Sequence, residues 1–152
     1  MPKVEIGKLP VRKGAGYPAQ LNKMFDGREK TALGNGVDLT QFGVNLTRIK
    51  PGSASALRHW HEKEDEFVYM LEGELVLVED EGEIVLKPGD CAGFKAGVKN
   101  GHQLVNRSNK DAVYLEVGTR SHVEYVGYPD HDLIVVRDEK GARALHRSGE
   151  PY

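Results

Sequence analysis

The run GSASALRHWHEKEDEFVYMLEG, residues 52–73, is the most informative part of the sequence. His59 and His61 are two positions apart, so in an extended strand both side chains project from the same face. The charged run EKED that follows suits a turn, and the apolar run FVYML after it suits a second strand. A hairpin of this kind can bring Glu66, at the start of the second strand, beside the two histidines.

A fourth candidate ligand, His102, lies in the later run GDCAGFKAGVKNGHQLVN, residues 89–106. It must reach the others through tertiary folding, and the glycines of this run allow sharp turns. Three imidazoles and one carboxylate suit a divalent transition metal ion. We therefore predict a metal site formed by His59, His61, Glu66 and His102. The alternative is that the histidines lie on a solvated face and that Glu66 merely ends the acidic run.

The pattern of the chain predicts an all-β protein with one main domain. Residues 1–36 carry basic and turn residues and are expected to form an N-terminal arm. Residues 37–120 read as short strands separated by turns, which is typical of a sandwich or barrel. Residues 121–152 are expected to form a C-terminal extension that packs on the main domain or on a partner subunit.

Alternation of apolar and polar residues locates the individual strands. A short helical turn is expected within residues 19–25. Strands are expected over residues 42–49, 57–61, 66–71, 74–78, 83–87, 104–105, 113–117 and 133–136.

Composition excludes several classes of function. The net charge of −2 gives no sign of a nucleic-acid or membrane-surface partner. No segment approaches the length of a membrane-spanning helix, and the N-terminus does not resemble a secretory signal. Cys91 is the single cysteine, which excludes an intramolecular disulfide and favours a cytoplasmic location. We expect Cys91 to be a buried small side chain.

Residues 52–106 resemble the two sequence motifs of the cupins. The first motif has a glycine, an HxH pair, a glutamate and a second glycine, as in residues 52–73, and the second motif ends in a histidine and an asparagine, as at His102 and Asn106. The second motif also departs from the pattern. Lys95 stands where it usually has proline, and four residues rather than two separate Gly97 from His102. Asn100 therefore competes with His102 for the ligand position, but an amide is the poorer metal ligand.

The resemblance implies a jelly-roll barrel, also called a double-stranded β-helix, with the metal near one mouth. Such barrels commonly form homodimers, often by exchanging N-terminal strands, so a homodimer is expected. The whole chain resembles small bacterial single-domain cupins that are called sugar-phosphate isomerases. The implied function is a metal-dependent enzyme that acts on a small oxygenated metabolite, with zinc, manganese, nickel or iron as the ion. The alternatives are an iron-dependent dioxygenase and a non-catalytic cupin that binds or senses a small molecule.

Substrate contacts are less well defined by the sequence. Lys95 and Lys99 lie on the loop expected at the barrel mouth and are the candidate contacts for a phosphate group; the alternative is that both are solvated surface lysines. The sequence identifies no catalytic base. Tyr69, Tyr114 and Glu116 are strand residues that could line the barrel; the alternative for each is a packing or dimer contact.

Overall fold

The computed structural model describes residues 2–152, and within them it contains β-strands and short 3-10 helices. All strand pairs in its sheets are antiparallel, which confirms the expected all-β class. The helical turn expected within residues 19–25 is present as two consecutive 3-10 helices. The four 3-10 helices are η1 (Ile6–Lys8), η2 (Ala19–Leu21), η3 (Lys23–Phe25) and η4 (Gly34–Val37).

The largest sheet has six strands in the order β1-β2-β3-β10-β5-β8. Its central strands β3 and β10 pair along their full lengths, which makes them the frame for the others. Strands β1 and β2 come from the expected N-terminal arm, so part of that arm belongs to the main sheet. The bounds are β1 (Val11–Lys13), β2 (Arg28–Ala32), β3 (Phe42–Ile49), β5 (Glu66–Glu72), β8 (Cys91–Phe94) and β10 (Ala112–Thr119).

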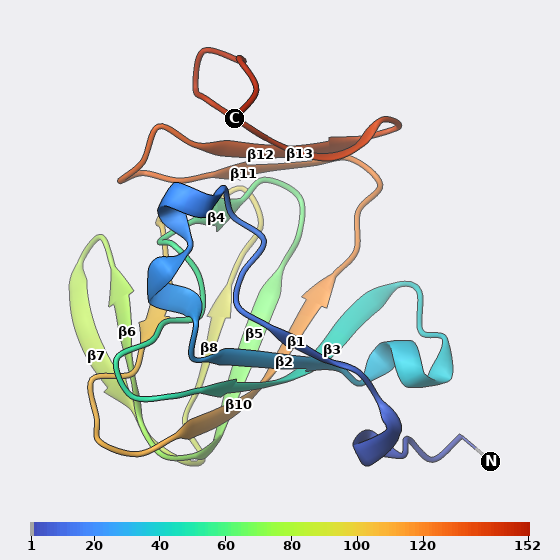
Figure 1. Ribbon diagram of the computed structural model, residues 1–152, viewed down its shortest axis with the longest axis vertical. Helices are drawn as coiled ribbons and strands as arrows, with labels where there is room; N and C mark the ends of the chain where they lie inside the picture. Colours follow the sequence, from blue (N-terminus) through green and yellow to red (C-terminus); the bar gives the residue numbers. More distant parts are fainter. Residues whose placement is uncertain (1) are drawn as a thin grey trace.

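Two smaller sheets complete the fold, and Figure 1 shows strands β11, β12 and β13 of one of them lying together across one end of the molecule. The three-stranded sheet has the order β7-β6-β9 and the four-stranded sheet has the order β13-β12-β11-β4. Because β4 carries His61, the four-stranded sheet joins the C-terminal residues to the first motif. The bounds are β4 (Trp60–His61), β6 (Leu75–Glu79), β7 (Gly82–Leu86), β9 (Gln103–Val105), β11 (Glu124–Gly127), β12 (Ile134–Asp138) and β13 (Gly141–Leu145).

Two buried apolar clusters hold the sheets together. The first joins the inner face of the six-stranded sheet to the three-stranded sheet, through side chains such as Met70, Leu75 and Leu104. The second packs under the four-stranded sheet and includes Phe25 of η3 and Leu133, both fully buried. Burial of each side chain of this size contributes roughly 1.5–3 kcal/mol. The N-terminal segment is therefore part of the core rather than a loose addition to it.

The structure differs from the expected strands in a few places. Of the strand expected over residues 57–61, only Trp60–His61 forms one, because the Leu57 amide donates to the Tyr17 hydroxyl instead of to a neighbouring strand. Strands β1, β2, β8, β11 and β13 were not expected. The expectation for Cys91 was wrong. Cys91 pairs with Tyr69, and both side chains are exposed because both point to the outer face of the sheet.

The turn between β5 and β6 generates a prediction about stability. Gly73 has a φ of +68°, and an added Cβ would lie 2.4 Å from the carbonyl oxygen of Asp111. Gly73→Ala is expected to lower the free energy of unfolding by more than about 2 kcal/mol, from left-handed backbone strain plus the clash. Urea titration of the wild type, of Gly73→Ala and of a control variant measures the effect. Gly7→Ala is the control, because no atom lies within 4 Å of its added Cβ; equal stability of the two variants would contradict the argument.

Candidate metal centre

The four predicted ligands lie together around one carboxylate oxygen. Oε2 of Glu66 is 2.8 Å from Nε2 of His102, 3.4 Å from Nε2 of His61 and 3.7 Å from Nε2 of His59. His61 lies on β4 and Glu66 begins β5. His59 and His102 pair with each other as an isolated bridge between the two motifs. This backbone pairing brings His102 beside the other candidate ligands, although it is distant from them in the sequence.

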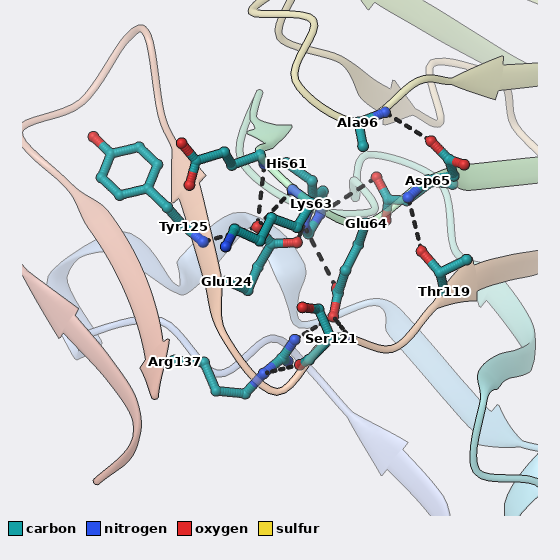
Figure 2. A network of polar contacts seen from close by, with 12 residues as sticks. His61, Lys63, Glu64, Asp65, Ala96, Thr119, Ser121, Glu124, Tyr125 and Arg137 are labelled. Atoms are coloured by element: carbon teal, nitrogen blue, oxygen red, sulfur yellow. Dashed lines mark hydrogen bonds and ion pairs between the residues drawn. The ribbon is translucent and has the colours of Figure 1, made fainter. Parts of the chain in front are cut away.

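Side-chain hydrogen bonds fix the turn that separates His61 from Glu66. The Asp65 amide donates to the Thr119 hydroxyl at 2.9 Å, and the Asp65 carboxylate accepts from the Ala96 amide at 2.8 Å (Figure 2). The Gly97 amide donates to the His61 carbonyl at 2.9 Å. These bonds attach the EKED turn to β10 and to the loop after β8, so that Glu66 faces the histidines.

The rings of His59 and His102 are held in place by their surroundings. Nδ1 of His59 lies 2.7 Å from the Leu57 carbonyl, which can only accept, so this nitrogen carries the proton and Nε2 is left with its lone pair. This arrangement prepares an imidazole for a metal ion. The His102 ring stacks on Phe94 with centroids 3.6 Å apart and planes 4° apart.

His61 is supported from behind by two carboxylates. Its Nδ1 lies 3.6 Å from Oε2 of Glu124 and 3.8 Å from Oε2 of Glu64, and Figure 2 shows both side chains beside it. Glu124 is only 4% exposed. Oε1 of Glu124 accepts hydrogen bonds from the backbone amides of Glu62, Lys63 and Tyr125 at 3.2, 3.0 and 2.8 Å. The C-terminal sheet thus supplies a buried, fixed negative charge behind a candidate ligand.

His61, Glu64 and Glu124 are also close enough together to hold a metal ion. Protein donors, however, already occupy Oε1 of each carboxylate, and Oε2 of each faces Nδ1 of His61. Glu64 pairs with Arg137 and accepts the Ser121 amide at 2.8 Å, and Glu124 accepts three amides. This group is therefore better suited to orienting His61 than to binding an ion of its own.

The electrostatics of the centre follow from burial and mutual contact. Burial alone would raise the pKa of Glu66, but its close contacts with His102, His59 and His61 outweigh burial and hold that pKa well below its usual range. Burial would lower the pKa of His61, but Glu66, Glu124 and Glu64 outweigh it and raise that pKa. Burial lowers the pKa of His102. Glu66 is consequently an anion at neutral pH.

The donor set fits a divalent transition metal ion. Three imidazoles and one ionised carboxylate converge, and the one tautomer that the hydrogen bonds define, that of His59, leaves Nε2 available. Imidazole and carboxylate ligands are compatible with several first-row metals and do not select one of them. These residues could therefore hold a divalent ion of unspecified identity.

Two cavities of about 210 Å³ each share the walls formed by His61, Glu66, Phe94 and His102. The β8 cavity continues along β8 and the loop after it, where Lys95 and Asn100 line it. The β2 cavity continues toward β2 and β10. Its further lining includes His59, Arg28, Lys30, Tyr114 and Glu116.

The remaining candidates of the sequence fall in different places. Lys95 is exposed on the β8 cavity, whereas Lys99 lies over the Trp60 ring, 5.5 Å from its centroid, and lines neither cavity. Asn100 accepts the Asp80 amide at 3.0 Å, and His102 rather than Asn100 faces Glu66. Tyr114 and Glu116 line the β2 cavity, and Tyr69 is on the outer face of the sheet.

Arg28 and Lys30 were not anticipated from the sequence. They alternate with Glu29 and Thr31 in a short polar run, REKTA, and that period-two spacing was the only available signal. The run lacks the apolar alternation that marks a strand, so nothing indicated which face would point inward.

A β-sheet fold with this histidine and carboxylate centre defines the class of protein. Residues 45–118 match the Cupin domain family model. The structure also superposes, with a TM-score of 0.95 and 47% sequence identity, on a sugar phosphate isomerase of the cupin superfamily from Silicibacter pomeroyi, covering 99% of this chain and 96% of that one. The chain belongs to the cupin superfamily.

Two further solved structures extend the comparison. A protein from Acidithiobacillus ferrooxidans, provisionally called a sugar phosphate isomerase, is 25% identical with a TM-score of 0.82, covering 97% of this chain and 92% of that one. The polyketide cyclase RemF from Streptomyces resistomycificus is 21% identical with a TM-score of 0.60, covering 78% and 79%. The second likeness shows the fold alone. No curated protein sequence matches the chain. Within residues 2–152, no helix is long and apolar enough to cross a membrane.

The contact of His61 with Glu124 predicts an effect on metal affinity. Glu124→Gln keeps the size of the side chain but removes the charge behind His61, so zinc binding is expected to weaken by about tenfold or more. Chelator-competition titration measures the affinity. Glu139→Gln, at an exposed position of the same C-terminal sheet, is the control. Equal zinc affinity in the two variants would show that Glu124 does not support the ligand.

Proposed function

We propose that this cupin is a metal-dependent enzyme of the sugar-phosphate isomerase type, which acts on a small oxygenated metabolite. The observation that carries the proposal is the convergence of three imidazoles on Glu66 at a wall shared by two cavities. The 47% identity to a sugar phosphate isomerase over nearly the whole chain supports the choice of reaction class.

His59, His61, Glu66 and His102 are the proposed ligands of a zinc, manganese, nickel or iron ion. Such an ion, when bound, polarises a substrate oxygen or lowers the pKa of a bound water. The protein orients the ligands through the Leu57 carbonyl, Phe94 and Glu124.

Proton transfer during an isomerisation requires a group that can hold a proton near the substrate carbons. We propose Glu116 for this role, because it lines the β2 cavity and has an anchored carboxylate. Oε1 accepts from Lys30 at 2.5 Å and from Asn45 at 3.1 Å. Tyr114 lies on the same strand, and burial followed by the charge of Glu116 raises the pKa of its hydroxyl. Tyr114 therefore stays protonated and donates a hydrogen bond to the substrate.

Several wider features are proposed with this function. The sheets form a jelly-roll barrel, flanked by an arm of residues 1–36 and an extension of residues 121–152. Lys95 contacts a substrate that enters from the β8 cavity. Lys99, on the same loop, is the second proposed substrate contact. The protein is proposed to be cytoplasmic, without nucleic-acid or membrane partners. A homodimer is supported by Phe67, Tyr69 and Leu71, which leave the outer face of β5 apolar and exposed; sedimentation velocity tests it.

Metal content is the first test of the proposal. Protein purified without added metal is expected to contain close to one ion per chain, and His59→Ala to lose most of it, because one of four ligands is removed. Elemental mass spectrometry measures both. His122→Ala, an exposed histidine outside the centre, is the control. The absence of metal in the wild type, even after reconstitution with several divalent ions, would overturn the proposal.

Turnover is the second test. A screen of aldose and ketose phosphates in deuterated water is expected to give isomerisation with deuterium exchange, and Glu116→Gln to lower kcat by about 100-fold or more at unchanged metal content. Glu72→Gln, exposed on β5, is the control. Oxygen consumption by iron-loaded protein would indicate the dioxygenase alternative. Ligand binding without any turnover would indicate a binding or sensing cupin.

A further inference from the structure

We infer that Arg28 anchors the anionic end of the ligand in the β2 cavity, and that the ligand is a small hydroxy or keto compound bearing a carboxylate or phosphate. The inference rests on the proposed function for the position of the reacting end and adds the substrate class. Arg28 lines the same cavity as His59, His61, Glu66 and His102.

Arg28 is a buried cation without a protein anion. It is only 9% exposed, and its Nη1 donates to the Gly14 carbonyl at 2.7 Å. Its Nε is buried without a hydrogen-bond partner in residues 2–152, and no carboxylate there forms an ion pair with it. Five other arginines each pair with an Asp or Glu, namely Arg48, Arg58, Arg107, Arg137 and Arg143.

A buried charge without a partner is costly, so it is typical of a binding site rather than of a structural core. The neighbouring charges do not compensate for it. Lys30 and Glu116 neutralise each other at 2.5 Å, and Glu66 faces the three histidines. Arg28 thus contributes the uncompensated positive charge of the β2 cavity, and a divalent ion at the centre would add to it.

The position of Arg28 is fixed before any ligand arrives. It stands at the start of β2 opposite Ile49, and the Gly14 carbonyl anchors one arm of the guanidinium. A planar guanidinium held in this way matches the two oxygens of a carboxylate or phosphate. Tyr114 adds a second donor, because its hydroxyl is fully buried at the cavity wall without a hydrogen-bond partner among residues 2–152.

The cavity is large enough for a small ligand. Its volume of about 210 Å³ accommodates a short hydroxy acid or a short sugar phosphate. Such a ligand can place its anionic group on Arg28 and Tyr114 and its hydroxyl or carbonyl oxygen toward the histidines.

Calorimetric titration of manganese-loaded protein with glycolate and with inorganic phosphate tests the inference, with ethylene glycol as the neutral analogue. Arg28→Gln is expected to bind both anions about tenfold or more weakly, with unchanged manganese content. Arg107→Gln, which removes an exposed arginine that lines neither cavity, is the matched control and is expected to bind like the wild type. The anion that binds more tightly to the wild type identifies the group that Arg28 receives.

Wild-type affinity for both anions in Arg28→Gln, or an equal loss in Arg107→Gln, would overturn the inference, as would equal affinity for ethylene glycol and glycolate. If Arg28→Gln does not fold, Arg28→Lys decides, because it keeps the charge but loses the planar pair of donors. Weaker glycolate binding in that variant supports the inference, and unchanged binding overturns it.

Failure of the proposed function is recognised separately, by repeating the phosphate titration on metal-free protein as a thermal shift. Phosphate that raises the Tm of the wild type but not of Arg28→Gln supports the anion site even if no metal binds. If Arg28→Gln keeps its metal, its turnover and its affinity for anions, the anion site alone is overturned and the proposed function stands.

Discussion

Two backbone hydrogen bonds between His59 and His102 are the constraint on which the centre depends. The His59 amide donates to the His102 carbonyl at 3.1 Å, and the His102 amide donates back at 2.9 Å. This pair joins the two motifs directly, and the side chains of both residues then reach Glu66 from the same region. Because antiparallel partners sit opposite each other, the pairing fixes the spacing of two imidazoles without any bound group. The rest of the fold holds these two segments in register.

The C-terminal sheet has a chemical role as well as a structural one. Strand β11 pairs with β4, with Val126 opposite His61, and the same strand begins with the buried Glu124. One short sheet therefore both aligns the backbone of a candidate ligand and presents a carboxylate to its outer nitrogen. A carboxylate in this position orients an imidazole and increases its basicity toward a metal ion.

The distribution of charge separates the two ends of the β2 cavity. At one end an ionised carboxylate and three imidazoles suit a cation. At the other end Arg28 is a buried cation without an ion-pair partner among residues 2–152, so an anion is favoured. The proposed ligand would place its anionic group on Arg28, whose buried charge has no ion-pair partner among residues 2–152, and its oxygen donor toward the histidines. This arrangement relates the cupin centre to a defined class of small molecules.

The sequence by itself determined the all-β class, most of the strands and the four candidate ligands, because these depend on local alternation and on the spacing of chemically specialised residues. Strand β3 matches its predicted range, and His59, His61, Glu66 and His102 do converge. Only the tertiary structure shows that Arg28 lines the β2 cavity and that Glu124 lies behind His61. A short polar strand does not reveal which face will be buried, and whether a buried charge has a partner depends on which distant segments pack around it.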